Sequence, residues 1–168
     1  MLLKNILNKG NWESSYQSIH INYNNKLWRQ IYTAYDNVDG FLFGVIDKSD
    51  GSSFSIDCES INDNEIYDYE WCESEYFSRL YNIDNNVAEH NRFELNIGNI
   101  RFLCVSYIFQ NKKHGKQIIV RGMSIGSSMV MAVNIAWKYY VDEDYEENIP
   151  PKFCIFMSGI ELNIDLDA

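Results

Sequence analysis

Short runs of β-forming residues, separated by turn signals, constrain the fold of this chain more than any other feature. In the first third of the sequence these runs cover residues 16–23, 27–35, 41–47 and 52–57. Asn24-Asn25 tolerates the positive φ of a tight turn, and Lys48-Ser49-Asp50-Gly51 has the composition of a hairpin turn. We therefore expect two β-hairpins, and so four strands, within this part of the chain.

The same alternation returns in the second half of the chain. Its runs cover residues 93–97, 100–109 and 117–121, with turn signals at 98–99 and 111–115. Strands joined by such short turns pair as antiparallel neighbours, so these runs predict a three-stranded meander. Phe153–Met157 follows Pro150-Pro151 and reads as a further edge strand, because proline is tolerated where a strand begins. Residues 83–91 have no clear period and read as a loop.

Two segments have apolar residues at helical spacing. In 60–80 this spacing follows Ser60, a capping candidate, and in 127–141 it follows Ser127, which can cap in the same way. The length of 168 residues fits one domain of ordinary size. We therefore expect a single α+β domain over residues 1–168, a mainly antiparallel sheet with two principal helices.

The net charge is −10, from 24 Asp and Glu residues against 14 Lys and Arg residues. Nucleic-acid-binding proteins gather Lys and Arg on one face to neutralise phosphates, so this balance disfavours a nucleic-acid partner and favours a basic one. Lys4 and Asn5 interrupt the N-terminal residues too early for the apolar core of a signal peptide. No run of apolar residues is long enough to span a membrane. We expect a cytoplasmic protein with no membrane partner.

The sequence gives no metal or cofactor motif. The four cysteines are Cys58, Cys72, Cys104 and Cys154. They are too far apart for a C-x-x-C zinc or redox pair, so we expect reduced thiols. Asp47, Asp50 and Gly51 lack the spacing and the closing glutamate of a calcium loop. No cofactor is implied.

Two acidic clusters supply the candidate binding residues. The stretch 57–75 holds eight acids and no Lys or Arg, interleaved with aromatic residues, and a second cluster follows the helix expected at 127–141. Aromatic rings provide rigid contact area, while carboxylates steer a basic partner and raise its association rate. A solvated face without a partner has the same composition, so both interpretations stay open. The candidate partner-binding residues are Tyr67, Asp68, Tyr69, Glu70, Trp71, Glu73, Glu75, Tyr76, Asp142, Glu143, Asp144, Glu146 and Glu147.

An enzymatic alternative starts from Gly122-Met123-Ser124-Ile125-Gly126, which matches the G-x-S-x-G nucleophile elbow between an expected strand and an expected helix. In that fold the histidine follows the serine, whereas all three histidines of this chain precede Ser124. Cys104 paired with His90 or His114 is a second option, although the sequence fixes no geometry for it. A small hydrolase with Ser124 or Cys104 as nucleophile is therefore the alternative hypothesis.

The stretch from Phe93 to Tyr140 resembles small bacterial α+β proteins found among the immunity proteins of polymorphic and contact-dependent growth inhibition toxin systems. The resemblance is carried by Phe93-x-Leu95-x-Ile97-Gly98, Arg101, Cys104, Gly122-x-Ser124, Ala132 and Ala136. It implies a cytosolic antitoxin that binds a toxin domain, commonly a cationic nuclease, and it brings no catalytic residues. The negative charge of the chain agrees with such a partner.

From sequence we therefore expect a non-catalytic immunity protein whose acidic, aromatic-rich face neutralises a basic toxin, most naturally a nuclease. An acidic DNA-mimic inhibitor is a further alternative, because the same surface would serve it and only the identity of the partner separates the two.

Overall fold

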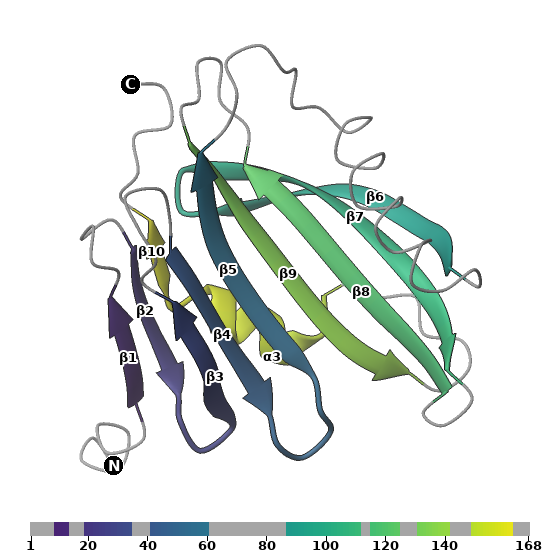
Figure 1. Cartoon of the computed structure of the whole chain (residues 1–168), viewed down its shortest axis with the longest axis horizontal. Coiled ribbons are helices and arrows are strands. Elements are labelled where there is room, and N and C mark those ends of the chain that lie inside the picture. Colours follow the sequence, from purple (N-terminus) through teal and green to yellow (C-terminus); the bar gives the residue numbers. More distant parts are fainter. Residues whose placement is uncertain are drawn as a thin grey trace.

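A seven-stranded antiparallel sheet dominates the computed structural model of the chain (Figure 1). The structure describes residues 9–13, 19–34, 41–60, 87–111, 115–124, 131–141 and 149–162. The strand order of this sheet is β3-β4-β5-β9-β8-β7-β6. Its strands are β3 (Trp28–Ala34), β4 (Phe41–Asp47), β5 (Ser53–Ser60), β6 (Val87–Ile97), β7 (Ile100–Asn111), β8 (Gly115–Ser124) and β9 (Met131–Val141).

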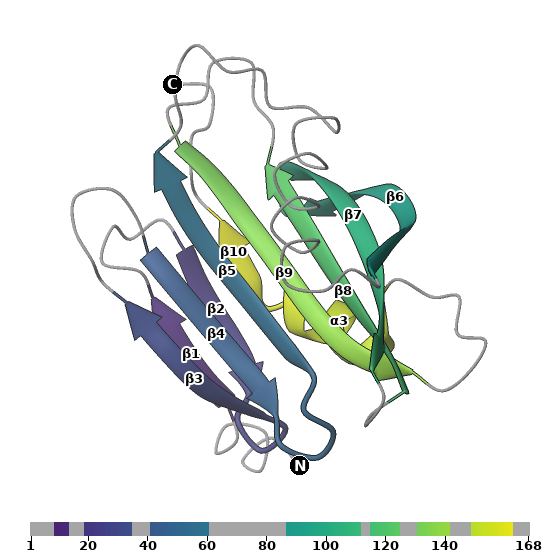
Figure 2. The ribbon, with the colours of Figure 1, turned by 45° about the vertical axis from the view of Figure 1, so that its right-hand side comes forward.

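A smaller sheet and a short helix form a second layer. The smaller sheet has the order β1-β2-β10 and consists of β1 (Lys9–Glu13), β2 (Ile19–Asn24) and β10 (Ile160–Leu162). Helix α3 (Pro151–Met157) comes directly before β10. Figure 2 shows the small sheet and α3 on the same side of the large sheet. The groove described below lies where this second layer meets strand β3 of the large sheet.

The large sheet consists of two meanders that meet at its centre. β3, β4 and β5 are consecutive neighbours, as are β6, β7, β8 and β9, and β5 pairs with β9 from Ser53 opposite Lys138 to Ser60 opposite Met131. The β4–β5 and β6–β7 turns contain Gly51 and Gly98 at φ 77° and 58°, values that favour glycine. The expected 41–57 hairpin and 93–121 meander are confirmed.

The expected helix over 127–141 is wrong, because Met131–Val141 forms strand β9. Along β9 the side chains of Val133, Ile135 and Trp137 are buried, and the residues between them are half-buried. This is the period of two of a strand, and β9 hydrogen-bonds to β5 on one side and β8 on the other. Valine and tryptophan four residues apart suit a helix, but the residues between them complete a strand pattern.

The other expected helix lies mostly outside the described residues, and the expected edge strand is a helix. Ser60 ends strand β5, and the rest of the segment 60–80 lies outside the described residues. The expected strand Phe153–Met157 is instead part of α3, which has a proline at its first turn and buries Phe153, Phe156 and Met157. The described part of the chain is thus mainly antiparallel sheet with one short helix, which corrects the expected α+β arrangement with two principal helices.

Two further expectations differ from the structure near the strand ends. The runs 16–23 and 27–35 do not form a hairpin, because β2 pairs with β1 and β10 while β3 pairs with β4. The chain crosses between the two sheets at residues 25–27, where the Lys26 amide donates to the side-chain oxygen of Asn24 at 3.0 Å. The expected loop over 83–91 is in its second part strand β6, which begins at Val87.

The core between the layers is rich in aromatic side chains. Phe156 of α3 lies 4.8 Å from Phe54 of β5 and 5.4 Å from Trp28 of β3, measured between ring centroids. Trp137 of β9 stacks on Phe54 with the planes 7° apart. These rings are almost completely buried. They fix α3 against the middle of the large sheet and so set one wall of the groove.

Candidate functional site

The structure does not place the residues proposed for partner binding from sequence, because all of them lie outside the described ranges. They are Tyr67, Asp68, Tyr69, Glu70, Trp71, Glu73, Glu75, Tyr76, Asp142, Glu143, Asp144, Glu146 and Glu147.

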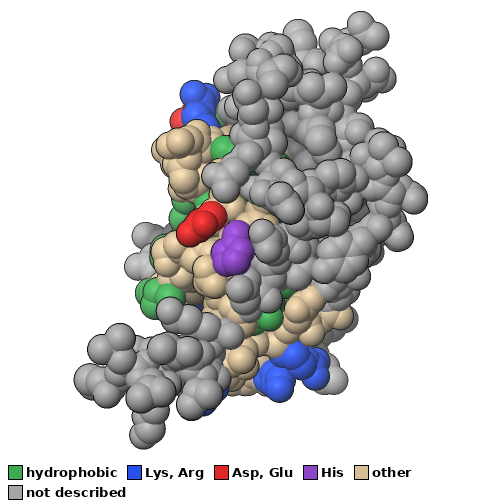
Figure 3. All heavy atoms as spheres, turned by 90° about the vertical axis from the view of Figure 1, so that its left-hand side faces the viewer, with side chains coloured by type: hydrophobic (Ala, Val, Ile, Leu, Met, Phe, Trp, Pro, Cys, Tyr) green, Lys and Arg blue, Asp and Glu red, His purple; other side chains and the backbone are tan. Residues whose placement is uncertain are grey.

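Acidic and basic residues are unequally divided between the described strands and the rest of the chain. The described ranges contain 10 of the 14 Lys and Arg residues but only 8 of the 24 Asp and Glu residues. Figure 3 shows one face of the molecule, on which the described acidic and basic side chains are scattered and form no patch of one sign. The acidic excess is therefore absent from the described β framework and belongs to the segments outside it.

The two residues considered as nucleophiles are buried. Ser124 ends β8 with 0% of its surface exposed, and its hydroxyl oxygen accepts a hydrogen bond from the amide of Val133 at 2.8 Å. The next described element is strand β9, whereas a nucleophile elbow leads into a helix. Cys104 is also fully buried, and a Cβ placed on Gly122 would overlap its sulfur. Neither side chain is presented to a substrate.

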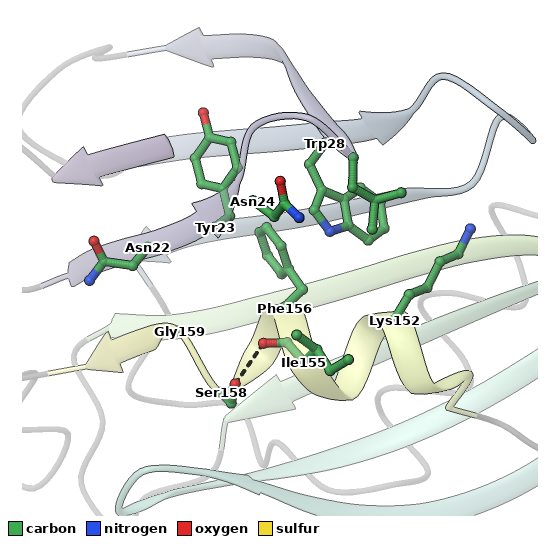
Figure 4. Close-up of a pocket in the computed structure, with 10 residues that line it drawn as sticks. Asn22, Tyr23, Asn24, Trp28, Lys152, Ile155, Phe156, Ser158 and Gly159 are labelled. Carbon is green, nitrogen blue, oxygen red and sulfur yellow. Dashed lines mark hydrogen bonds between the residues drawn. The ribbon is translucent and has the colours of Figure 1, made fainter. Parts of the chain in front are cut away.

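One concave site formed by described residues is a groove between the β2–β3 corner and helix α3. It has a volume of about 470 Å³. We call it the α3 groove, and Figure 4 shows its lining. Its lining residues are Asn22, Tyr23, Asn24, Leu27, Trp28, Lys152, Ile155, Phe156, Ser158 and Gly159. Segments far apart in sequence therefore build it together.

Apolar side chains form most of the groove. Trp28 and Phe156 are buried at 3% and 2% exposure and supply fixed rings, while Ile155 on the solvent side of α3 is 73% exposed. In Figure 4 the Phe156 ring points up from α3 to a position between Tyr23 and Trp28. A large exposed isoleucine beside fixed rings can bind an apolar group without any rearrangement of the fold.

Lys152 of α3 forms ion pairs with two carboxylates at the β4–β5 turn. Its ammonium nitrogen lies 3.0 Å from a carboxylate oxygen of Asp47 and 2.5 Å from one of Asp50. The same nitrogen stands 5.6 Å from the Trp28 ring centroid, in a cation–π position. The Asp47 side chain is only 4% exposed and that of Asp50 is 50% exposed. The three charges together sum to −1, with the outer carboxylate in contact with water.

The pKa values of both carboxyl groups are lowered despite their burial. For Asp47, burial raises the pKa, but hydrogen bonds from the Ser49 hydroxyl and amide and from Lys152 outweigh it. For Asp50, burial again raises the pKa, and bonds from Lys152 and Ser52 outweigh it. Burial also raises the pKa of the Tyr23 phenol. Tyr23 is therefore neutral at physiological pH, and both aspartates are ionised.

The Asp47 linkage predicts an acid-sensitive contribution to stability. A carboxyl group with a lowered pKa in the folded state stabilises the fold above its unfolded pKa of about 3.9, and this contribution is lost as the pH falls through the folded value. We expect Asp47→Asn to lower the free energy of unfolding at pH 6, and the difference from wild type to shrink as the pH approaches 3. Urea titrations at both pH values measure this difference.

The control for this prediction is Glu94→Gln. Glu94 forms an ion pair with Arg101 in which both side chains are at least half exposed, so it should change stability little at either pH. A difference for Asp47→Asn that stays constant from pH 6 to pH 3 would contradict the linkage.

Polar groups of Asn22, Asn24 and Ser158 lie on the rim of the groove. The Asn24 side-chain oxygen accepts a bond from the Lys26 amide, which leaves the amide nitrogen of that side chain uncommitted in the described structure. The side chain of Asn22 is exposed, and its backbone amide donates to Gly159. The Ser158 hydroxyl donates to the carbonyl of Ile155 at 2.6 Å. The rim therefore offers hydrogen-bond donors and acceptors beside an apolar floor.

Sequence reasoning missed this groove. The sequence pattern predicts a hairpin turn at Asn24 and an edge strand over Ile155 and Phe156, not two walls of one groove. The signal that was available is Pro151 followed by Phe153, Phe156 and Met157, because proline at a first helical position with apolar residues three and four apart indicates a helix. Nothing in the sequence indicates which other segment packs beside this helix.

Two sequence expectations about metals and membranes can be compared with the described residues. Among them, no group of three or more His, Cys, Asp or Glu side chains is placed to hold a metal ion. The helix of the described part is too short to cross a membrane.

Comparison with known proteins finds similarity of structure. No protein-family model matches the chain, and no curated protein matches it. The solved structure of cyanobacterial PsbP (CyanoP) from Synechocystis sp. PCC 6803 has a TM-score of 0.59 at 8% identity, covering 92% of each chain. The Ran-binding protein Mog1p of Saccharomyces cerevisiae has a TM-score of 0.53 at 10% identity, covering 95% of this chain and 96% of Mog1p. At these identities the likeness shows a shared fold.

Proposed function

We propose that this chain is a non-catalytic immunity protein, which binds a cationic toxin domain of the nuclease type in the bacterial cytoplasm and neutralises it. The observation that carries the proposal is the clustering of acidic residues along the sequence, since the stretch 57–75 holds eight acids and no Lys or Arg. Of 24 acidic residues, 16 lie outside the described ranges, together with only 4 of the 14 basic ones. An acidic excess of this size would attract a basic partner and raise its association rate.

Two further observations support a binding role over catalysis. Ser124 and Cys104, the candidate nucleophiles, are buried, and the Ser124 oxygen is engaged by a backbone amide. The solved structures with a similar fold include a protein named for binding Ran, so this fold is able to present a protein-binding surface. The alternative hydrolase would need one of these side chains to reach a substrate, which their burial opposes.

The proposal predicts that the first acidic cluster contributes strongly to affinity. We expect the double substitution of Trp71→Ala with Glu73→Ala to weaken toxin binding by about 2 kcal/mol or more, since an aromatic anchor and its carboxylate are removed together. The partner to test is a cationic C-terminal domain encoded next to this chain. Calorimetry gives the affinity, and survival of cells expressing both proteins gives neutralisation.

Glu161→Ala is the matched control, because Glu161 is an exposed acid on β10, outside both clusters. It should bind and protect as wild type does. Equal affinity of the double variant and wild type would place the binding face elsewhere. Wild-type protein that binds no cationic toxin domain, but captures a DNA-binding restriction or repair factor, would replace the immunity proposal with DNA mimicry.

A further inference from the structure

The α3 groove has an apolar side chain that the fold leaves exposed. Among the described residues, Ile31 and Ile155 are the large hydrophobic side chains with substantial exposure, and Ile155 is the more exposed of the two at 73%. Ile155 lines the groove from α3 and lies below the rings of Trp28 and Phe156 in the view of Figure 4. The hydrophobic effect favours a ligand that covers Ile155, because this side chain leaves apolar surface in contact with water at the groove.

The polar groups of the rim match a peptide backbone. Each peptide unit has one N–H donor and one carbonyl acceptor, and side-chain amides offer both. Asn22 and Asn24 stand two residues apart on β2, so their side chains leave the strand on the same side. The amide nitrogen of Asn24 has no described partner, and Figure 4 shows the Asn24 side chain between Tyr23 and Trp28.

The charges at the groove favour a ligand that has a Lys or Arg residue next to its apolar side chain. Lys152 lines the groove, but its ammonium is shared by Asp47 and Asp50, so the three groups sum to −1. Asp50 keeps half of its side-chain surface in contact with water. An anionic ligand would compete with two carboxylates for Lys152, whereas a Lys or Arg side chain can approach the exposed face of Asp50.

A second copy of this chain fits the groove less well than a partner segment does. Each copy has a net charge of −10, and the resulting repulsion opposes self-association. Stable protein interfaces use about 20–30 residues on each side, whereas the groove has ten lining residues. This size suits a short extended segment.

We infer that the α3 groove is a docking site for an extended segment of the toxin, which seats a bulky apolar side chain among Leu27, Trp28 and Ile155 and places a basic residue beside Asp50. The inference rests on the proposed function, which supplies the cationic partner. It assigns to the described β framework a contact separate from the two acidic clusters. Tight binding would then combine electrostatic attraction by the clusters with an apolar anchor on a rigid site.

The experiment titrates the isotope-labelled full-length chain with capped pentapeptides and follows its amide resonances by NMR. The probes are Gly-Lys-Leu-Lys-Gly, its glutamate counterpart Gly-Glu-Leu-Glu-Gly, and Gly-Lys-Ser-Lys-Gly without the apolar side chain. We expect the first to shift the resonances of Asn22, Asn24, Ile155 and Ser158 at millimolar concentration. The other two should bind at least about fivefold more weakly, because each lacks one element of recognition.

Matched variants locate the site. Ile155→Asp should weaken binding of the first peptide about tenfold or more, while Ile31→Asp, which changes an exposed isoleucine that does not line the groove, should leave it unchanged. Thermal unfolding establishes that both variants are folded. Asn24→Ala supplies a second test that leaves the apolar floor intact, and we expect it to weaken binding by about threefold or more.

Certain outcomes overturn the inference. These are no resonance shifts up to about 5 mM peptide, shifts located outside the groove, equal binding of the leucine and serine peptides, or equal losses in Ile155→Asp and Ile31→Asp. If any of these occurs while the wild-type chain still neutralises its toxin, the groove assignment fails and the proposed function stands. If the peptide binds at the groove but the chain binds no toxin domain, the groove is a peptide site and the proposed function fails.

Discussion

Replacing Phe156 with alanine is expected to lower the free energy of unfolding by about 3–5 kcal/mol, as for other buried phenylalanines. Phe156 is 2% exposed, and its ring contacts Tyr23, Trp28 and Phe54 on three different strands. Its removal leaves a cavity at the junction of α3, the small sheet and the large sheet. Phe153 of the same helix keeps its contacts with Trp28, Phe54 and Trp137, so α3 stays in place and collapse around the cavity would be incomplete.

Urea unfolding followed by circular dichroism measures this loss, and the neighbouring residue provides the control. Ile155→Ala also removes a large apolar side chain from the same helix, but Ile155 is 73% exposed, so its loss should change stability by about 0.5 kcal/mol or less. A Phe156→Ala variant as stable as Ile155→Ala would mean that α3 does not pack on the sheet as described. Because Ile155 also lines the α3 groove, Ile155→Ala tests binding there without a large loss of stability.

The second large effect is expected at Trp137, in the middle of β9. Trp137 is 1% exposed and contacts Phe54, Phe93 and Phe153. Trp137→Ala should cost about 3–5 kcal/mol, since it removes a large ring from the centre of the core. Thermal and urea unfolding of the variant measure the loss.

Alanine variants at neighbouring positions of β9 show whether residues 131–141 form a strand or a helix. A strand alternates with period two, so Lys138→Ala, on the opposite face, should cost less than about 1 kcal/mol, while Ile135→Ala should again cost about 2–5 kcal/mol. A helix would instead group Val133, Trp137 and Val141 as its buried side and expose Ile135. Losses that follow the helical grouping would contradict the strand.

The fold was predictable from sequence where turn residues join two strands that pair with each other. Gly51 and Gly98 occur at turns whose backbone requires positive φ, and the strands on either side pair as neighbours, so both elements and pairing were predictable. The assignment failed at β9, where Val133 and Trp137 fit a period of four and a period of two equally well. Pairing with β5, which lies far away in sequence, selects the strand.

The α3 groove was not predictable for a related reason. Phe153, Phe156 and Met157 give one short helical face, yet the opposing Asn24 and Trp28 belong to a corner between two sheets. No local signal connects these segments, because only the completed sheets bring them together. Lys152 is likewise paired with Asp47 and Asp50, more than a hundred residues earlier in the chain. The residues of the two acidic clusters proposed for binding lie outside the described ranges, so their role stays a prediction.

The two-meander construction of the large sheet affects how the chain is made in the cell. β3, β4 and β5 can pair as soon as they are synthesised, but β5 stays at an open edge until β9 arrives to join it. At synthesis rates of about 5–20 residues per second, the interval from Ser60 to Val141 is on the order of 4 to 16 seconds. During this time Phe54 and Ile56 lack their partner strand, and an unpaired apolar edge invites association with other nascent chains. Chaperone demand during translation should therefore be concentrated on the β5 edge, and pairing of β9 with it should end that demand.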